Sequence, residues 1–72
     1  MTHLELGERI QKLRRANNLT RDQLASKAGL SSKFLYEIET GKKGLSVESL
    51  LKIAEGLSCG YHDILIEESE ED

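Results

Sequence analysis

Four short segments of this chain repeat one helix-start pattern, which restricts the fold more than any other feature of the sequence. In each, an apolar residue precedes Ser or Thr, and a second apolar residue lies four positions after the hydroxyl residue. The hydroxyl residues are Thr2, Thr20, Ser31 and Ser46. A hydroxyl at this place caps the free N–H groups of a first helical turn, and the two apolar residues pack together as a staple. Glu5 and Gln23, each three residues after a threonine, complete capping boxes.

Each of these helix starts is followed, after enough residues to form a helix, by residues that end helices. They are Asn17-Asn18, Gly29, Gly41 and Ser58-Cys59-Gly60. The expected helices therefore cover 3–16, 21–28, 32–40 and 47–57, with a further short helix at 61–65. In the fourth helix, the residues expected to face the core are Leu50, Leu51, Ala54 and Leu57. Because such short connections join neighbouring helices, the sequence predicts an all-α fold, a compact four- to five-helix bundle.

Acidic residues gather at the C-terminal end of the chain. Of the thirteen acidic residues, five lie in residues 67–72, which leaves eight acidic against ten basic residues in the rest. The net charge of −3 is therefore the sum of a body at +2 and a tail at −5. A short run of like charge without apolar residues is typical of disorder. We expect one folded domain over residues 1–66 and a disordered acidic tail over 67–72.

Cysteine and histidine, which most often form disulfides and metal sites, are scarce in this chain. The single cysteine, Cys59, cannot form an internal disulfide and is expected as a buried thiol in a reducing compartment. His3 and His62 stand far apart with no ligand cluster around either. No apolar run approaches the roughly 20 residues that span a bilayer. The sequence therefore predicts a cytoplasmic protein that is not an enzyme and has no metal, no cofactor and no membrane partner.

The third expected helix carries a polar strip on the side that faces away from the core. At about 100° per residue, Leu35 and Ile38 point toward the second helix, where Leu24 and Ala25 receive them. The polar strip consists of Ser32, Lys33, Tyr36, Glu37 and Thr40. Lys33 and Glu37 are also spaced as a surface ion pair, which is the structural alternative to a binding role.

The segment "LTRDQLASKAGLSSKFLYEIETGKKGLSVESLLKIAEGLSCGYHDIL" resembles the helix-turn-helix domain of the phage repressor and Cro family, the XRE type. The features that match are Leu24, Ala25, Gly29 at the turn, Leu30, Leu35, Ile38, "IETGK" and "SLLKIAEGL". In that family the second helix of the motif enters the major groove of DNA. The resemblance implies a small prokaryotic or phage-type transcriptional regulator, repressor-like, which binds double-stranded DNA sequence-specifically through residues 32–40.

The resemblance also assigns roles to single positions. Residues that match base-reading positions are Ser32, Lys33 and Glu37. Residues that match positions near the DNA backbone or the groove wall are Arg21, Ser31, Tyr36, Thr40, Lys42 and Lys43. Arg14 and Glu39 match a structural ion pair between the first and third helices. The chain departs from the family pattern in three places. Gly44-Leu45 replaces a frequent Asn-Pro, Gly60 replaces the usual hydroxyl cap of the last helix, and Glu37 is negative where a neutral or basic residue is common.

Two expectations concern protein partners. Ile64, Leu65 and Ile66 are three consecutive apolar residues, too many for one thin helical face to bury, so with Tyr61 they are candidates for a homodimer contact. The weak charge of the body and the acidic tail also leave open an alternative function, that of an antitoxin or anti-repressor of the same fold. The main partner would then be another protein.

Overall fold

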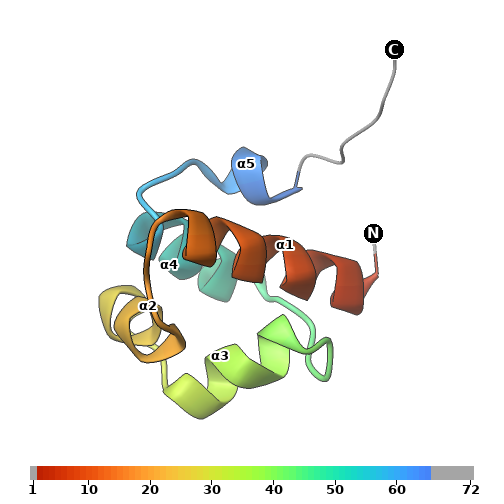
Figure 1. Ribbon diagram of the computed structural model, residues 1–72. Coiled ribbons are helices and arrows are strands. Elements are labelled where there is room, and N and C mark those ends of the chain that lie inside the picture. The colour runs from red at the N-terminus through yellow and green to blue at the C-terminus, as the bar shows by residue number, and fades with distance from the viewer. Residues whose placement is uncertain (1, 66–72) are drawn as a thin grey trace.

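The computed structural model describes residues 2–65, which form five helices and no strand (Figure 1). They are α1 (His3–Ala16), α2 (Arg21–Ala28), α3 (Ser32–Glu39), α4 (Val47–Gly56) and α5 (Tyr61–Leu65). The all-α prediction is confirmed, and the helix bounds differ from the expected ones by one residue at most. The staple from Met1, the dimer candidate Ile66 and the acidic run 67–72 lie outside the described residues.

The helix starts follow the predicted capping chemistry. The side chains of Thr2, Thr20, Ser31 and Ser46 each accept a hydrogen bond from the backbone N–H three residues later. Both capping boxes are present, because Glu5 and Gln23 accept from the backbone N–H of their threonines. Helix α5 begins in another way. Asp63 reaches back and accepts from the Gly60 N–H at 3.0 Å, so a carboxylate in the first turn acts where the N-cap hydroxyl is missing.

One apolar core joins all five helices. Its fully buried side chains are Ile10, Leu24, Leu35, Ile38, Ile53 and Ile64. In Figure 1, α1 lies between α3 on one side and α5 on the other, and it packs against both of them. Arg9 on α1 adds a polar link by donating to the Asp63 carbonyl at 3.1 Å.

One part of the core prediction was wrong. Leu51 was expected to be buried, but it is 50% exposed, and Ile53 is buried instead. The inward stripe of α4 is Leu50, Ile53, Ala54 and Leu57, which follows helical spacing. Leu51 lies about 100° from Leu50 around the helix axis and therefore outside this stripe.

Gly7 is the point where α1 comes closest to α3. A Cβ atom at this position would overlap the carbonyl oxygens of Ile38 and Glu39, the last two residues of α3. Only glycine lets the two backbones approach this closely, so Gly7 fixes the distance between α1 and the end of α3.

We expect Gly7→Ala to destabilise the fold by about 3 kcal/mol, measured as the free energy of unfolding in urea. Alanine favours a helix by about 1 kcal/mol over glycine, but here the overlapping atoms are backbone atoms that cannot rotate away. Glu8→Ala, at the adjacent exposed position, is the matched control and should change stability little. A Gly7→Ala protein as stable as the wild type would contradict the close approach of α1 and α3.

Candidate nucleic-acid interface

Helices α2 and α3 form a compact unit around a glycine turn. Gly29 follows α2 with a φ of 69°, in the left-handed region that favours glycine. The Leu30 N–H then donates to the Ala25 carbonyl at 2.9 Å and closes the turn. Ser31 caps α3 immediately afterwards, and Leu35 and Ile38 enter the core. The polar strip is therefore left on the outer side of α3.

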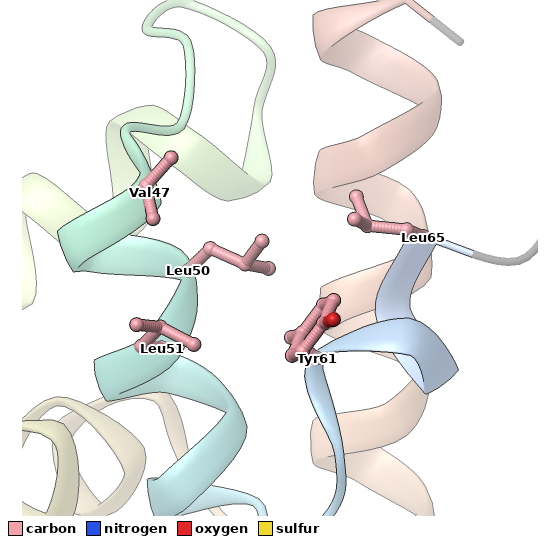
Figure 2. A pocket seen from close by; sticks show the side chains of 5 residues that line it. All are labelled: Val47, Leu50, Leu51, Tyr61 and Leu65. Carbon is pink, nitrogen blue, oxygen red and sulfur yellow. The ribbon is translucent and has the colours of Figure 1, made fainter.

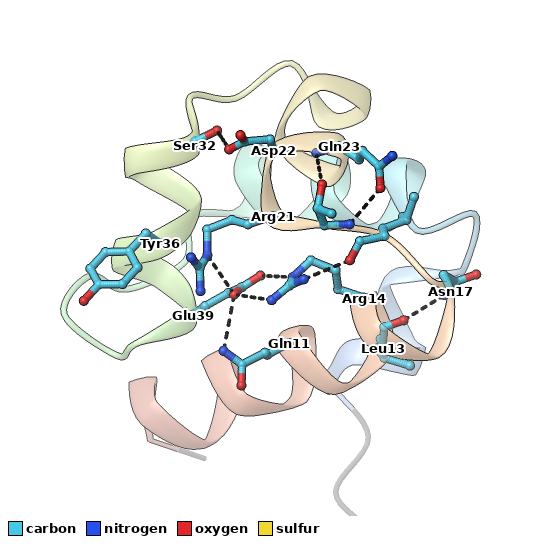
Figure 3. A network of polar contacts seen from close by, with 12 residues as sticks. Gln11, Leu13, Arg14, Asn17, Arg21, Asp22, Gln23, Ser32, Tyr36 and Glu39 are labelled. Carbon is cyan, nitrogen blue, oxygen red and sulfur yellow. Dashed lines mark hydrogen bonds and ion pairs between the residues drawn. The ribbon is translucent and has the colours of Figure 1, made fainter.

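A buried carboxylate fixes the end of α3 against α1. The Glu39 side chain is 0% exposed, and the Arg14 Nε lies 2.8 Å from its Oε2 (Figure 3). The Arg14 Nη2 donates to Glu39 Oε1 at 3.2 Å, and Nη1 donates to the Leu19 carbonyl at 2.8 Å. The structure thus contains the expected Arg14–Glu39 pair, with the whole guanidinium of Arg14 engaged.

Two further residues join this carboxylate, and the sequence analysis missed both contacts. Arg21 donates from Nε to Glu39 Oε1 at 3.1 Å, and Gln11 donates to the same oxygen at 3.4 Å. The Arg21 guanidinium also lies 5.0 Å from the centre of the Tyr36 ring. Tyr36 precedes Glu39 by three positions on α3, so a cation from α2 that reaches Glu39 passes over the Tyr36 ring. That spacing was visible in the sequence, but the partner of Glu39 on α2 was not.

The loop after α3 folds back onto the helix end. The backbone N–H groups of Lys42 and Lys43 both donate to the Glu37 carbonyl, at 2.9 and 3.1 Å. The Lys43 ammonium lies 3.3 Å from Glu37 Oε1 and 5.1 Å from the Phe34 ring centre. The Lys42 ammonium lies 5.7 Å from the Tyr36 ring centre. In the described part of the chain Glu37 therefore pairs with Lys43, whereas the surface-pair interpretation had given it Lys33.

The serine and threonine hydroxyl groups of the predicted site each have a partner within the protein. Ser31 Oγ accepts from the Phe34 N–H, and Thr40 Oγ1 donates to the Tyr36 carbonyl at 2.8 Å. Ser32 Oγ lies 2.5 Å from Asp22 Oδ1, which joins the start of α3 to the first turn of α2. Asp22 had no role in the sequence analysis.

The described dimer candidates differ in their exposure to solvent. Tyr61 and Leu65 are 53% and 43% exposed, but Ile64 is fully buried in the core, contrary to the expectation that it contacts a partner. Helix α5 packs against α1 and α4 and turns Ile64 into the core. The exposed pair borders an apolar groove of about 400 Å³ between α4 and α5 (Figure 2). Its lining residues are Val47, Leu50, Leu51, Tyr61 and Leu65.

Over residues 2–65, no three His, Cys, Asp or Glu side chains come together as a metal site, and none of the helices combines the length and the apolar character of a membrane span. Cys59 is half-buried against the core. Burial raises the pKa of its thiol, and the nearby Asp63 carboxylate raises it further, so the reactive thiolate is disfavoured.

Comparison with known proteins places this arrangement among helix-turn-helix proteins. A family model described as a helix-turn-helix domain matches residues 7–58. The chain is 31% identical over 64 residues to y4mF of Sinorhizobium fredii, an uncharacterized HTH-type transcriptional regulator, and the match covers 89% of this chain and 83% of the relative. The chain spans less than half the length of several other curated relatives that it matches.

Two solved structures are similar throughout. The restriction-modification controller protein C.AhdI from Aeromonas hydrophila superposes with a TM-score of 0.84 at 27% identity, over 86% of this chain and 94% of that protein. The regulator of biofilm formation SinR, crystallised in complex with DNA, superposes with a TM-score of 0.80 at 29% identity, over 85% of this chain and 98% of that one.

The unequal roles of the two arginines at Glu39 give a prediction about stability. Arg14→Ala removes two contacts to a carboxylate that water does not reach, so we expect a loss of about 3 kcal/mol or more in the free energy of unfolding. Arg21→Ala leaves Glu39 paired with Arg14, and because the Arg21 side chain is 32% exposed, a loss of about 1 kcal/mol or less is expected. Denaturant unfolding measures both, with exposed Arg15→Ala as control. Equal losses for Arg14 and Arg21 would contradict this assignment.

Proposed function

Because this chain belongs to the helix-turn-helix domain family, we propose that it is a transcriptional regulator that binds double-stranded DNA sequence-specifically. The observation that carries the proposal is the outward polar strip of α3, held by the core on its other side and flanked by cations. The similarity to SinR, whose structure contains DNA, supports this function over that of an antitoxin or anti-repressor. Regulation follows from occupancy of the DNA site, in the cytoplasm of a prokaryotic cell.

In this proposal α3 enters the major groove and presents its N-terminal half to base edges. Lys33 is exposed and, over residues 2–65, has no ion pair, so its ammonium is free to reach a guanine. Around the helix axis, Ser32 and Glu37 lie on either side of Lys33, about 100° and 40° away from it. These three side chains read bases, and together they sample about four or five base pairs.

Arg21 and Lys42, which both lie close to the Tyr36 ring, hold phosphates. Within the described residues Arg21 donates only from Nε, which leaves the two outer nitrogens of its guanidinium available for a phosphate. The Tyr36 ring, 5.0 Å from Arg21 and 5.7 Å from Lys42, holds both cations near one place. Ser31, Thr40 and Lys43 border the same surface. They contact the DNA backbone or the wall of the DNA groove.

A second copy completes the binding unit. The polar strip of one copy reads about four or five base pairs, and a sequence this short recurs far too often in a genome to specify a site. Two copies, with their polar strips about one helical turn apart, are therefore needed. We assign the homodimer contact to the groove between α4 and α5, where Val47, Leu51, Tyr61 and Leu65 are exposed. In Figure 1, α1 separates α5 from α3, so a partner docked on this groove leaves the strip free.

A salt titration of duplex binding tests the proposed function. Each phosphate contact contributes about 0.9 to the slope of log affinity against log salt. We expect a steep slope for the wild-type protein and a slope lower by about 1 for Lys42→Ala, with all duplexes weakened alike. Lys52→Ala is the matched control, because this lysine pairs with Glu48 on α4, away from α3. Duplex binding that does not depend on salt would exclude DNA as the main ligand.

The dimer contact is tested by placing a charge in the groove. Leu51→Glu should dissociate the dimer in sedimentation experiments, because an ionised carboxylate loses its water when two copies meet there. Leu4→Glu changes a leucine of similar exposure, 51% against 50%, on α1 outside the groove. It should leave the dimer intact. If Leu51→Glu sediments like the wild type, the contact between copies lies elsewhere.

A further inference from the structure

The hydroxyl of Ser32 has its hydrogen committed to a neighbouring side chain. Its oxygen lies 2.5 Å from Asp22 Oδ1, and the two residues face each other where α2 and α3 meet (Figure 3). A carboxylate accepts hydrogen bonds and has none to give, so the hydrogen between the two oxygens belongs to Ser32. A short bond from a hydroxyl to a carboxylate is also stronger than a bond between neutral groups.

The fold keeps Asp22 in this place. Asp22 lies in the first turn of α2, where the partial positive charge of the helix N-terminus favours a carboxylate. Thr20 and Gln23 lock that turn through a capping box, and Ser31 caps α3 one residue before Ser32. Both partners of the bond therefore sit on first turns that are independently fixed.

This bond decides what Ser32 can offer to a base. A free serine hydroxyl can donate or accept, so it discriminates poorly between base edges. With its hydrogen held by Asp22, the oxygen presents only lone pairs. In the major groove the hydrogen-bond donors are the amino groups, N6 of adenine and N4 of cytosine. The negative charge of Asp22 also repels the acceptor atoms of guanine and thymine.

We propose that Asp22 is a specificity-determining residue that acts through Ser32. By fixing the hydroxyl as an acceptor, it makes the chain select a base with an amino group opposite Ser32. This inference rests on the proposed function, since it requires α3 to lie in the major groove. Asp22 is a positioning residue here, because it acts on the base through the Ser32 hydroxyl.

The first step of the test locates the base pair that Ser32 reads. Binding sites are selected from random duplex DNA with the wild-type protein, Ser32→Ala and Asp22→Asn. We expect both variants to lose the preference at one shared position and to keep the others. Asparagine has the shape of aspartate but can donate to Ser32, which frees the hydroxyl to read either kind of edge. Ser26→Ala, an exposed hydroxyl elsewhere on α2, should select the wild-type site.

The second step removes the amino group itself. At that position adenine is replaced by purine, or cytosine by 2-pyrimidinone, either of which deletes the amino group from the groove. Wild-type affinity should fall about five- to tenfold, as for the loss of one hydrogen bond. Affinity of Ser32→Ala should stay within about twofold, because its contact is already absent.

The outcomes separate the two proposals. Wild-type protein that selects no site would overturn the proposed function, and this inference with it. A selected site that is insensitive to Ser32→Ala, or to the deletion of the amino group, would overturn only the role of Asp22. Thermal unfolding of each variant accompanies the selection. If Asp22→Asn does not fold, the amino-group deletion compared between wild type and Ser32→Ala still decides whether Ser32 accepts from that base.

Discussion

The rest of the structure depends on one carboxylate that is shielded from water. Removing Glu39 and Arg14 from solvent costs several kcal/mol, which only well-formed hydrogen bonds offset. Both oxygens of Glu39 meet Arg14, and the third nitrogen of that guanidinium holds the Leu19 carbonyl in the turn before α2. A single ionic group therefore joins α1, the entry to α2 and the last turn of α3. Gly7 complements it by letting the α1 backbone approach the same turn closely.

This constraint explains how so short a recognition helix is held in place. Helix α3 has 8 residues, too few to be stable alone in water. Its start is fixed by the Ser31 cap and its end by Glu39, while Leu35 and Ile38 anchor the side between them. The network around this buried carboxylate extends to the surface, because the partly exposed Arg21 also donates to Glu39 and lies over Tyr36. Stability and the proposed DNA contacts thus draw on one continuous network, in which Arg14 is structural and Arg21 is the proposed phosphate contact.

The local parts of this fold were predictable, and the contacts between helices were not. Caps such as Thr20 and Ser31 act within one turn, so residue types at fixed spacing suffice to place them. Leu51 was misplaced because the side of α4 that is buried depends on how α2 and α5 pack against it. Ile64 was misplaced because the buried side of α5 likewise depends on how α1 and α4 pack against it. The links from Arg21 to Glu39 and from Ser32 to Asp22 join different helices, and side-chain directions across a helix crossing do not appear in the spacing along one chain.

The mixed charge of the surface has a consequence for recognition. Attraction to phosphates gives most of the non-specific affinity, and it is independent of sequence. Here Arg21 shares its charge with Glu39, and Lys43 lies against Glu37, so part of the positive charge is balanced within the protein. A surface of this kind binds random DNA weakly. In the proposed complex, discrimination then depends on base contacts and on the proposed second copy, both of which raise the ratio of specific to non-specific binding. Acidic side chains beside α3 are therefore consistent with a DNA-binding helix, because they lower the affinity for wrong sites more than for a site with matching donors.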